Sequence, residues 1–174
     1  EKKIGGYSNF LNLFKEYKPN IFGLSESILQ MYENVCKVPS DKLFLNPNGV
    51  NSQAFKKTNN PIYSDRSIYL AKIDYRKRQH LFQSIDSLWY AGNIADDRFD
   101  TNKNYLGEWT KPELYDRLTE YGNLVLLSDG EAHPLVCMEA LAAGLGVVVC
   151  EWGSAKLDLN KKFIDVIPED KIND

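Results

Sequence analysis

Residues 123–150, NLVLLSDGEAHPLVCMEALAAGLGVVVC, are the stretch of sequence that decides the fold. It begins with one apolar run, residues 123–127, and ends with another, residues 147–150, and both runs are typical of buried strands. Between them, residues 134–143 predict a helix that ends at Gly144. Two buried strands joined by a helix of this length predict a parallel pair with a right-handed crossover.

The same alternation of strands and helices continues on both sides of this stretch. One helix has a clear start, because Thr110 and Glu113 form a capping box with Pro112 in the first turn. We predict an α/β fold, a Rossmann-like parallel sheet with helices on both faces, in which a ligand lies beyond the carboxyl ends of the strands. The further predicted elements are strands at residues 68–73, 87–91, 104–106 and 163–167 and helices at residues 76–84 and 110–122.

The first 48 residues have a pattern of their own, which ends in the strong turn sequence Asn46-Pro47-Asn48-Gly49. A polar linker at residues 56–64 then leads to the predicted sheet. We expect residues 1–48 to form one domain segment and residues 49–174 to form the other. The elements predicted in the first segment are a helix at residues 10–17, strands at 20–24 and 42–45, and a helix that follows the N-cap residue Ser25.

Composition excludes several classes of protein. With 174 residues, 43% of them hydrophobic, the chain can bury one substantial core. The net charge of −3 and the pI near 5.5 argue against a nucleic-acid partner, which requires a strongly basic face. The longest uncharged apolar run, residues 140–150, is shorter than the roughly 20 residues that cross a bilayer, and no signal-peptide pattern opens the chain. We expect a cytoplasmic protein in which Cys36, Cys137 and Cys150 are buried, unpaired residues.

Two glutamates mark the segment that carries the chemistry. Glu139 is the only Asp, Glu, Lys or Arg between Ala132 and Cys150, so its carboxylate lies on an otherwise apolar helix. It either faces solvent or is buried with compensating partners, such as the paired hydroxyls of a ligand. Glu131 lies where the loop meets the helix N-terminus, a position that binds anions. The two carboxylates can therefore hold the two ends of a ligand that contains a diphosphate and a sugar.

Glu131 and Glu139, separated by seven residues and followed by Ala-Leu-Ala-Ala-Gly, resemble the E-x7-E signature of retaining GT-B glycosyltransferases, the group 1 family. The resemblance implies that Glu131 contacts the donor sugar and that Glu139 binds the ribose hydroxyls. It also implies that the loop and first helical turn between them, with His133, Leu135 and Val136, approach the sugar and the phosphates.

Two further motifs resemble the same family in order and spacing. Lys72 and Lys77 hold the positions of the arginine and lysine that neutralise the donor diphosphate in that family. The run from Tyr105 through Gly107 to Trp109 is similar to the family turn that lies against the nucleotide base. The resemblance therefore implies a catalytic role for Glu131, Lys72 and Lys77 and a donor-binding role for Gly107 and Trp109.

The family implies the donor-binding domain of a hexosyltransferase, one half of a two-domain GT-B architecture. The resemblance also implies a UDP- or GDP-sugar donor, retention of the anomeric configuration, and a glycan, lipid or protein acceptor. No cofactor or metal is implied, and the sequence has no His/Asp/Glu cluster with ligand spacing. A membrane enters only through the acceptor.

The ends of the chain bear on its completeness. The chain opens without an initiator methionine and stops soon after a strand-like run. We expect residues 1–48 to be the tail of the acceptor-side domain with its crossover segment. Residues 49–174 are then a donor domain truncated at its C-terminus, whose partner is a missing N-terminal acceptor domain. Alone, such a fragment binds its donor and transfers little sugar.

Two alternatives share the architecture. A binding module can keep the fold without transferase activity, and a non-hydrolysing nucleotide-sugar epimerase uses carboxylates and histidines in the domain cleft, although this chain has only His80 and His133. A nicotinamide-dependent oxidoreductase is disfavoured, because Gly144-Leu145-Gly146 follows a helix and opens a strand, the reverse of the dinucleotide-binding order.

Overall fold

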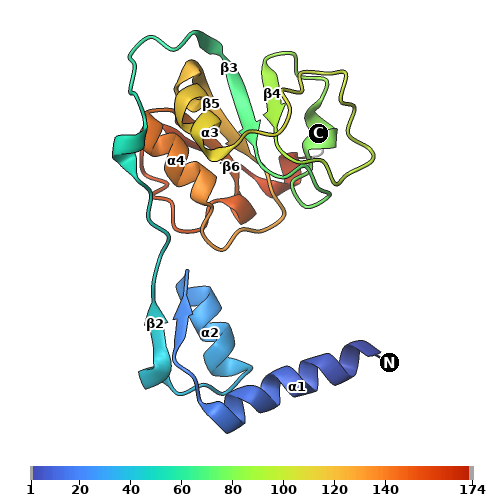
Figure 1. Ribbon diagram of the computed structural model, residues 1–174, viewed down its shortest axis with the longest axis vertical. Helices are drawn as coiled ribbons and strands as arrows, with labels where there is room; N and C mark the ends of the chain where they lie inside the picture. The colour runs from blue at the N-terminus through green and yellow to red at the C-terminus, as the bar shows by residue number, and fades with distance from the viewer. Residues whose placement is uncertain (1, 173–174) are drawn as a thin grey trace. The chain divides into compact units, whose positions relative to one another are not determined.

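The computed structural model of the protein describes residues 2–172, and the chain divides into two compact units between Asn48 and Gly49. Figure 1 shows both units, each with its own strands and helices. Each unit is described by itself below.

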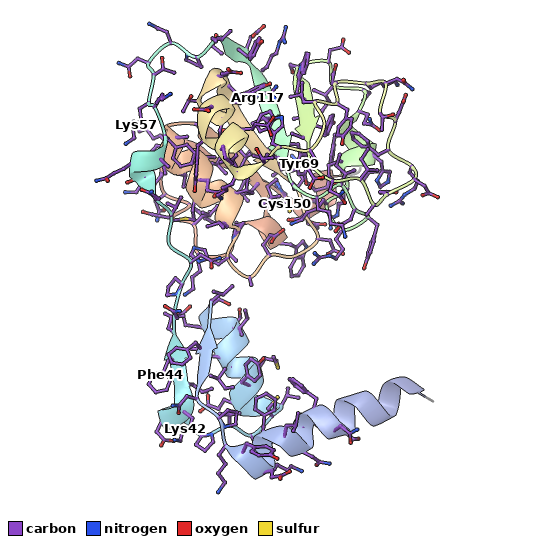
Figure 2. The ribbon with its side chains drawn as sticks, in the orientation of Figure 1. Lys42, Phe44, Lys57, Tyr69, Arg117 and Cys150 are labelled. Atoms are coloured by element: carbon purple, nitrogen blue, oxygen red, sulfur yellow. The ribbon has the colours of Figure 1, made fainter. Side chains whose placement is uncertain are left out.

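The first unit is a small α/β arrangement with two parallel strands. Its elements are α1 (Lys2–Tyr17), β1 (Ile21–Gly23), α2 (Glu26–Asn34) and β2 (Leu43–Leu45), and β1 pairs in parallel with β2. The Oγ of Ser25 accepts a hydrogen bond from the amide of Ile28 at 3.4 Å, which confirms the predicted N-cap of α2. Aromatic contacts connect the elements: Phe14 lies against Tyr32, and Phe22 stacks on Phe44, which Figure 2 labels.

The second unit contains a five-stranded parallel sheet with the strand order β4-β3-β5-β6-β7. The strands are β3 (Tyr63–Leu70), β4 (Leu88–Ala91), β5 (Tyr121–Leu126), β6 (Gly146–Cys150) and β7 (Ile164–Ile167). All four pairings are parallel, so the predicted Rossmann-like sheet is confirmed. The order reverses between β3 and β5, because the chain leaves β3 toward one edge and later continues from β5 toward the other. In open parallel sheets, such a switch point is where ligands bind.

Two α-helices accompany this sheet, α3 (Lys111–Arg117) and α4 (Leu135–Ala143) (Figure 1). The predicted capping box of α3 is present, with the amide of Glu113 bonded to the side chain of Thr110 and the Glu113 carboxylate bonded to the Thr110 amide. Helix α4 packs against β5 and β6 and ends, as predicted, at Gly144, whose φ of 94° lies in the left-handed region that favours glycine.

The core of the second unit is apolar and dense. It includes fully buried side chains from the central strands, among them Ile68, Leu124 and Val149, together with Cys137 and Ala140 of α4. Cys36, Cys137 and Cys150 are all buried and unpaired, as the sequence predicted. Burial raises the pKa of the Cys137 thiol to about 12, so this thiol stays protonated and acts as a small apolar side chain.

The helix predicted at residues 76–84 is wrong. The segment forms turns followed by a short 3₁₀ helix, η3 (Gln79–Phe82), that begins after Arg78. Arg78 has a φ of 58°, which interrupts any helix, and its guanidinium contacts the carboxylates of Asp129 and Glu169. Gln79 is completely buried and donates to the carbonyl of Lys72 at 3.0 Å. These long-range contacts override the local helical spacing, because they use the side chains that helical geometry would direct elsewhere.

Two smaller predictions also need correction. The helix predicted at residues 110–122 ends at Arg117 and is followed by a 3₁₀ turn, η4 (Leu118–Glu120), because Tyr121 is buried as the first residue of β5. The strand predicted at residues 104–106 is a single parallel bridge between Tyr105 and Tyr90. The remaining 3₁₀ helices are η1 (Ser40–Lys42), η2 (Ser52–Ala54), η5 (Glu151–Gly153) and η6 (Glu169–Lys171).

Candidate functional site

The candidate site lies at the carboxyl edge of the sheet in the second unit. Because β3 to β7 are all parallel, the loops that follow them emerge at this same edge. Lys72 follows β3, Asn93 follows β4, and the loop with Glu131 follows β5. The strand order reverses between β3 and β5. A crevice is therefore expected between the loop that follows β3 and the loop that follows β5.

A pocket of about 400 Å³ lies at this edge, and it brings together five of the residues that the sequence selected: Lys72, Trp109, Leu135, Val136 and Glu139. They come from the β3 loop, the segment before α3, and α4. The other lining residues are Leu70, Ala71, Gly92, Asn93, Glu108 and Leu114. The pocket has apolar walls with a few polar groups, which is the usual composition of a small-molecule site.

Glu139 is buried, as one of its two sequence interpretations required. Only 4% of the residue is exposed, and its Oε1 forms an ion pair with the ammonium group of Lys111. Lys111 is the first residue of α3, and its ammonium also lies 5.3 Å from the centre of the Tyr115 ring. The Lys111 side chain is half-exposed, so solvent reaches the cation while the carboxylate is held inside. Glu139 therefore lies in the pocket wall with its carboxylate oriented by Lys111.

Glu131 and Lys77 meet each other, which the sequence analysis did not foresee. The Lys77 ammonium and Glu131 Oε1 form an ion pair in which both side chains are largely buried. Ser128 Oγ donates to the same carboxylate oxygen at 2.8 Å, and the Glu131 amide donates to the carbonyl of Trp152 at 2.9 Å. Neither member of the pair is among the residues that line the 400 Å³ pocket.

A buried tyrosine supports the loop that carries Lys77. The Tyr69 hydroxyl donates to the carbonyl of Lys77 and accepts from the amide of Leu127 at 2.8 Å. Burial raises the pKa of Tyr69 well above its usual value, so the hydroxyl keeps the proton that it donates. Figure 2 labels Tyr69 and Cys150, and both side chains are fully buried in the second unit. Tyr69 therefore fixes the backbone of Lys77 relative to the end of β5.

The N-terminus of α4 supplies backbone donors to the same edge. Pro134 is its N-cap and forms no side-chain capping hydrogen bond. The amides of Leu135 and Val136 are in the first turn, where helical amides have no acceptor within the helix. His133 precedes them and is buried, and it does not line the pocket. The first turn of α4 can therefore bind an anion through its amides and its dipole.

Gly107 shapes the pocket without lining it. Its φ of 84° is in the left-handed region, and its carbonyl accepts a hydrogen bond from the amide of Gly92 at 3.0 Å. This turn brings Glu108 and Trp109 into the pocket wall. The Trp109 ring also lies under the guanidinium of Arg117 at 4.4 Å, so it packs against α3 as well as against the pocket.

Sequence reasoning missed three residues of the site: Lys111, Asn93 and Glu108. Lys111 could have been identified from sequence. A lysine at the first position of a helix is unfavourable next to the positive end of the helix dipole, which suggests a carboxylate partner. Asn93 and Glu108 had no such signal, since they are polar loop residues whose proximity is tertiary. Both line the pocket, and Asn93 Nδ2 donates to Glu108 Oε2 at 3.3 Å.

Two searches for other features were negative over the part of the chain that the structure describes. Residues 2–172 contain no group of three or more His, Cys, Asp or Glu side chains that could hold a metal ion. Among the same residues, no helix has both the length and the apolar character needed to span a bilayer.

By sequence, no family model and no curated protein matches the chain. Comparison by structure finds many similar chains. The chain is similar to WaaG, a glycosyltransferase involved in lipopolysaccharide biosynthesis, with a TM-score of 0.69 and 15% identity over 86% of this chain and 49% of WaaG. It is also similar to HepE of Anabaena, solved with UDP and glucose, with a TM-score of 0.65 and 14% identity over 84% of this chain and 48% of HepE.

A third similar structure contains a single domain. It is the C-terminal domain of a glycosyl transferase group 1 family protein, LpcC, from Francisella tularensis, with a TM-score of 0.52 and 15% identity over 69% of this chain and 80% of that domain. The chain spans about half the length of WaaG and HepE. It has the fold of the GT-B glycosyltransferases, and its parallel sheet matches one Rossmann-like half of that architecture.

Proposed function

We propose that this chain is the donor-binding half of a glycosyltransferase and that its second unit binds a nucleoside-diphosphate sugar. The observation that carries the proposal is the 400 Å³ pocket, because it gathers Lys72, Trp109 and Glu139 at the switch point of a parallel sheet. These residues come from three separate segments, each selected from sequence for a different part of the same ligand. The glycosyltransferase fold of the chain agrees with this assignment.

The polar groups of the site match the parts of such a donor. Glu139 accepts hydrogen bonds from the ribose hydroxyls, since a buried carboxylate held by Lys111 binds a diol well. The exposed ammonium of Lys72 and the first-turn amides of α4 neutralise the diphosphate. In the transfer step these same groups stabilise the charge that grows on the leaving diphosphate as the bond to the sugar breaks.

Glu131 belongs to the sugar end of the donor in this proposal. It lies just before α4 and forms an ion pair with Lys77. A diphosphate that reaches Lys77 competes with the Glu131 carboxylate for the ammonium, and the displaced carboxylate is then available to the sugar hydroxyls. The transfer proceeds with retention, Lys77 assists diphosphate departure, and the acceptor is held mainly by residues of another domain.

The proposal is tested by thermal unfolding of the 174-residue chain with UDP, GDP, ADP, their sugar conjugates and NAD. A ligand at a hundred times its Kd adds about 2.7 kcal/mol, roughly 5–10 °C for a domain of this size. We expect a nucleoside diphosphate to stabilise the wild type and Glu139→Gln to lose most of the shift. Asp165→Asn is the matched control, because Asp165 is an exposed carboxylate on β7. Stabilisation by NAD alone, or by no nucleotide at millimolar concentration, would overturn the donor-site assignment.

The sugar role of Glu131 has a separate test. Glu131→Gln frees Lys77, so affinity for the nucleoside diphosphate is expected to stay equal or to rise. Affinity for the corresponding nucleotide sugar is expected to fall relative to the diphosphate, because the variant loses the carboxylate that holds the hydroxyls. Asp165→Asn, an exposed carboxylate on β7, is again the control. Equal losses for both ligands would remove Glu131 from the sugar site.

A further inference from the structure

One tyrosine hydroxyl connects the two loops that carry the ion pair of Lys77 with Glu131. Tyr69 is completely buried, and its hydroxyl donates to the backbone carbonyl of Lys77 in the loop after β3. The same hydroxyl accepts from the amide of Leu127, directly after β5, at 2.8 Å. The next residue, Ser128, donates through its Oγ to Glu131 Oε1 at 2.8 Å. Tyr69 therefore contacts the backbone on both sides of the ion pair.

Backbone hydrogen bonds hold the β5 loop to its two neighbours. The amide of Asp129 donates to the carbonyl of Arg76 at 2.7 Å, and the amide of Glu131 donates to the carbonyl of Trp152 at 2.9 Å. The contact from Tyr69 differs from these two because a side chain makes it. It can therefore be removed by substitution while the chemistry of the loop backbone stays unchanged.

The position of the Lys77 backbone matters for the task that the proposed function gives its side chain. A diphosphate that binds the ammonium replaces the Glu131 carboxylate, so the ammonium has to stay in place while the carboxylate moves. A long lysine side chain loses conformational freedom when it is held by a phosphate, and a mobile backbone would add to that loss. A carbonyl held by a buried hydroxyl reduces the second cost.

We propose that Tyr69 is a positioning residue for the donor diphosphate, which acts through the backbone of Lys77 and does not contact the ligand. The inference rests on the proposed function, because it takes diphosphate binding at Lys77 from there. It goes further than that function, since it makes donor affinity depend on a hydroxyl that is buried and does not line the pocket.

The test is a double-mutant cycle on the 174-residue chain with UDP, GDP and ADP, in which calorimetry measures the affinity of chains that circular dichroism shows to be folded. Lys77→Gln removes the cation and is expected to weaken the tightest of the three at least about tenfold. Tyr69→Phe is expected to weaken it about threefold to tenfold, because the ammonium remains but is less well placed. In the Lys77→Gln background, Tyr69→Phe is expected to change the affinity less than about twofold.

Tyr90→Phe is the matched control. Tyr90 is also completely buried, its ring centre lies 6.2 Å from that of Tyr69, and its hydroxyl has no hydrogen-bond partner among the described residues. This variant is expected to change the affinity less than about twofold in both backgrounds.

Two outcomes of the cycle overturn the inference and leave the donor-site assignment to Glu139 intact. The first is a loss in Tyr69→Phe of the same size with and without the Lys77 cation, which is the result of a purely structural role. The second is a Tyr69→Phe affinity equal to that of Tyr90→Phe. If none of the three diphosphates binds the wild type, the proposed function and this inference fail together.

A measurement on the wild type decides the case in which Tyr69→Phe does not fold. Hydrogen exchange followed by NMR reports on the amide of Leu127, which donates to the Tyr69 hydroxyl. Because coupling between two sites is reciprocal, saturation with the tightest of the three diphosphates is expected to slow exchange of this amide severalfold. The same saturation of Lys77→Gln is expected to leave the rate unchanged. An equal Leu127 rate with and without ligand in the wild type would overturn the inference.

Discussion

Two buried carboxylates of the second unit are each held by a cation, and the pairs have different consequences. Glu139 lies in the pocket wall against Lys111, which comes from a helix 28 residues earlier in the chain. Asp96 is 5% exposed and accepts two bonds of 2.8 Å from the Arg98 guanidinium, a neighbour in sequence. Neither carboxylate tolerates loss of its cation, because a buried charge without a partner is expensive.

Removal of the Lys111 cation is predicted to destabilise the chain. Lys111→Met leaves the Glu139 carboxylate buried with no ion-pair partner, so the free energy of unfolding should fall by about 1–3 kcal/mol. Lys111→Arg should retain most of the wild-type free energy of unfolding. Urea denaturation measures the change, and Lys103→Met, at an exposed loop position, should stay within about 0.5 kcal/mol of the wild type. A Lys111→Met variant as stable as that control would show that the pair contributes nothing.

The Asp96 pair predicts a specific pH dependence. The hydrogen bonds from Arg98 hold the pKa of Asp96 below its ordinary value. Burial raises this pKa, and the charge of Arg98 lowers it further. Because the pKa is lower in the folded state, the stabilisation is complete above the unfolded pKa of about 3.9 and is lost as the pH falls through the folded value.

The measurement is the Tm of wild type and Asp96→Asn between pH 7 and pH 3. The gap between the two should be constant from pH 7 to about pH 5 and should narrow below about pH 4. His80 Nδ1 lies 3.2 Å from Asp96 Oδ2, so His80→Gln is the companion variant that separates the histidine from the carboxylate. A gap that widens as the pH falls would contradict the assigned sign.

At the scale of the element, the capping residues of α3 and α4 decide where each helix begins and ends. Helix α3 has seven residues and begins with a complete capping box, so its start depends on one side-chain pair. Helix α4 begins without a side-chain cap and ends at Gly144. Substitution at the start of α3 should have the larger effect on stability, because this start also places Lys111 next to Glu139.

Loss of the capping box is predicted to weaken the chain measurably. Thr110→Ala removes the acceptor for the Glu113 amide and should cost about 1 kcal/mol of unfolding free energy. Thr101→Ala, at an exposed turn, is the control and should change it little. Both values come from urea denaturation of the full chain. Equal values for the two variants would show that α3 does not need its cap.

At the scale of the whole molecule, the two units differ in how much they bury. Among the described apolar side chains of the first unit, only Cys36 and Val38 are buried, whereas the second unit has an extended buried cluster across its sheet. Stability against local opening follows the buried apolar contacts around a segment. The two units should therefore open independently and at different free energies.

Hydrogen exchange followed by mass spectrometry tests this difference. Amides of β3, β5 and β6 are predicted to exchange at least about a hundredfold more slowly than amides of β1 and α2, corrected for intrinsic rates. Addition of a nucleoside diphosphate that raises the Tm of the chain should slow exchange further in the first turn of α4. Equal protection in both units would mean that the chain opens as a single cooperative structure.

The sequence by itself determined the fold class and most of the order of the elements. Apolar runs such as residues 147–150 predict buried parallel strands because both faces of such a strand are covered, and this information is local. The caps at Thr110 and Gly144 were likewise readable, since a cap depends on a few adjacent residues. The motifs selected Lys72, Trp109 and Glu139 one by one, and the structure places all three in the lining of one pocket.

Tertiary structure alone decided the partners of the charged groups. The pairing of Lys77 with Glu131, and of Lys111 with Glu139, depends on the distance between side chains that are far apart in the sequence. The helix expected at residues 76–84 was lost for the same reason, because Arg78 is drawn into long-range ion pairs. Periodicity and capping report local preferences, whereas ion pairs and pocket walls arise only where the sheet brings separate loops to one edge.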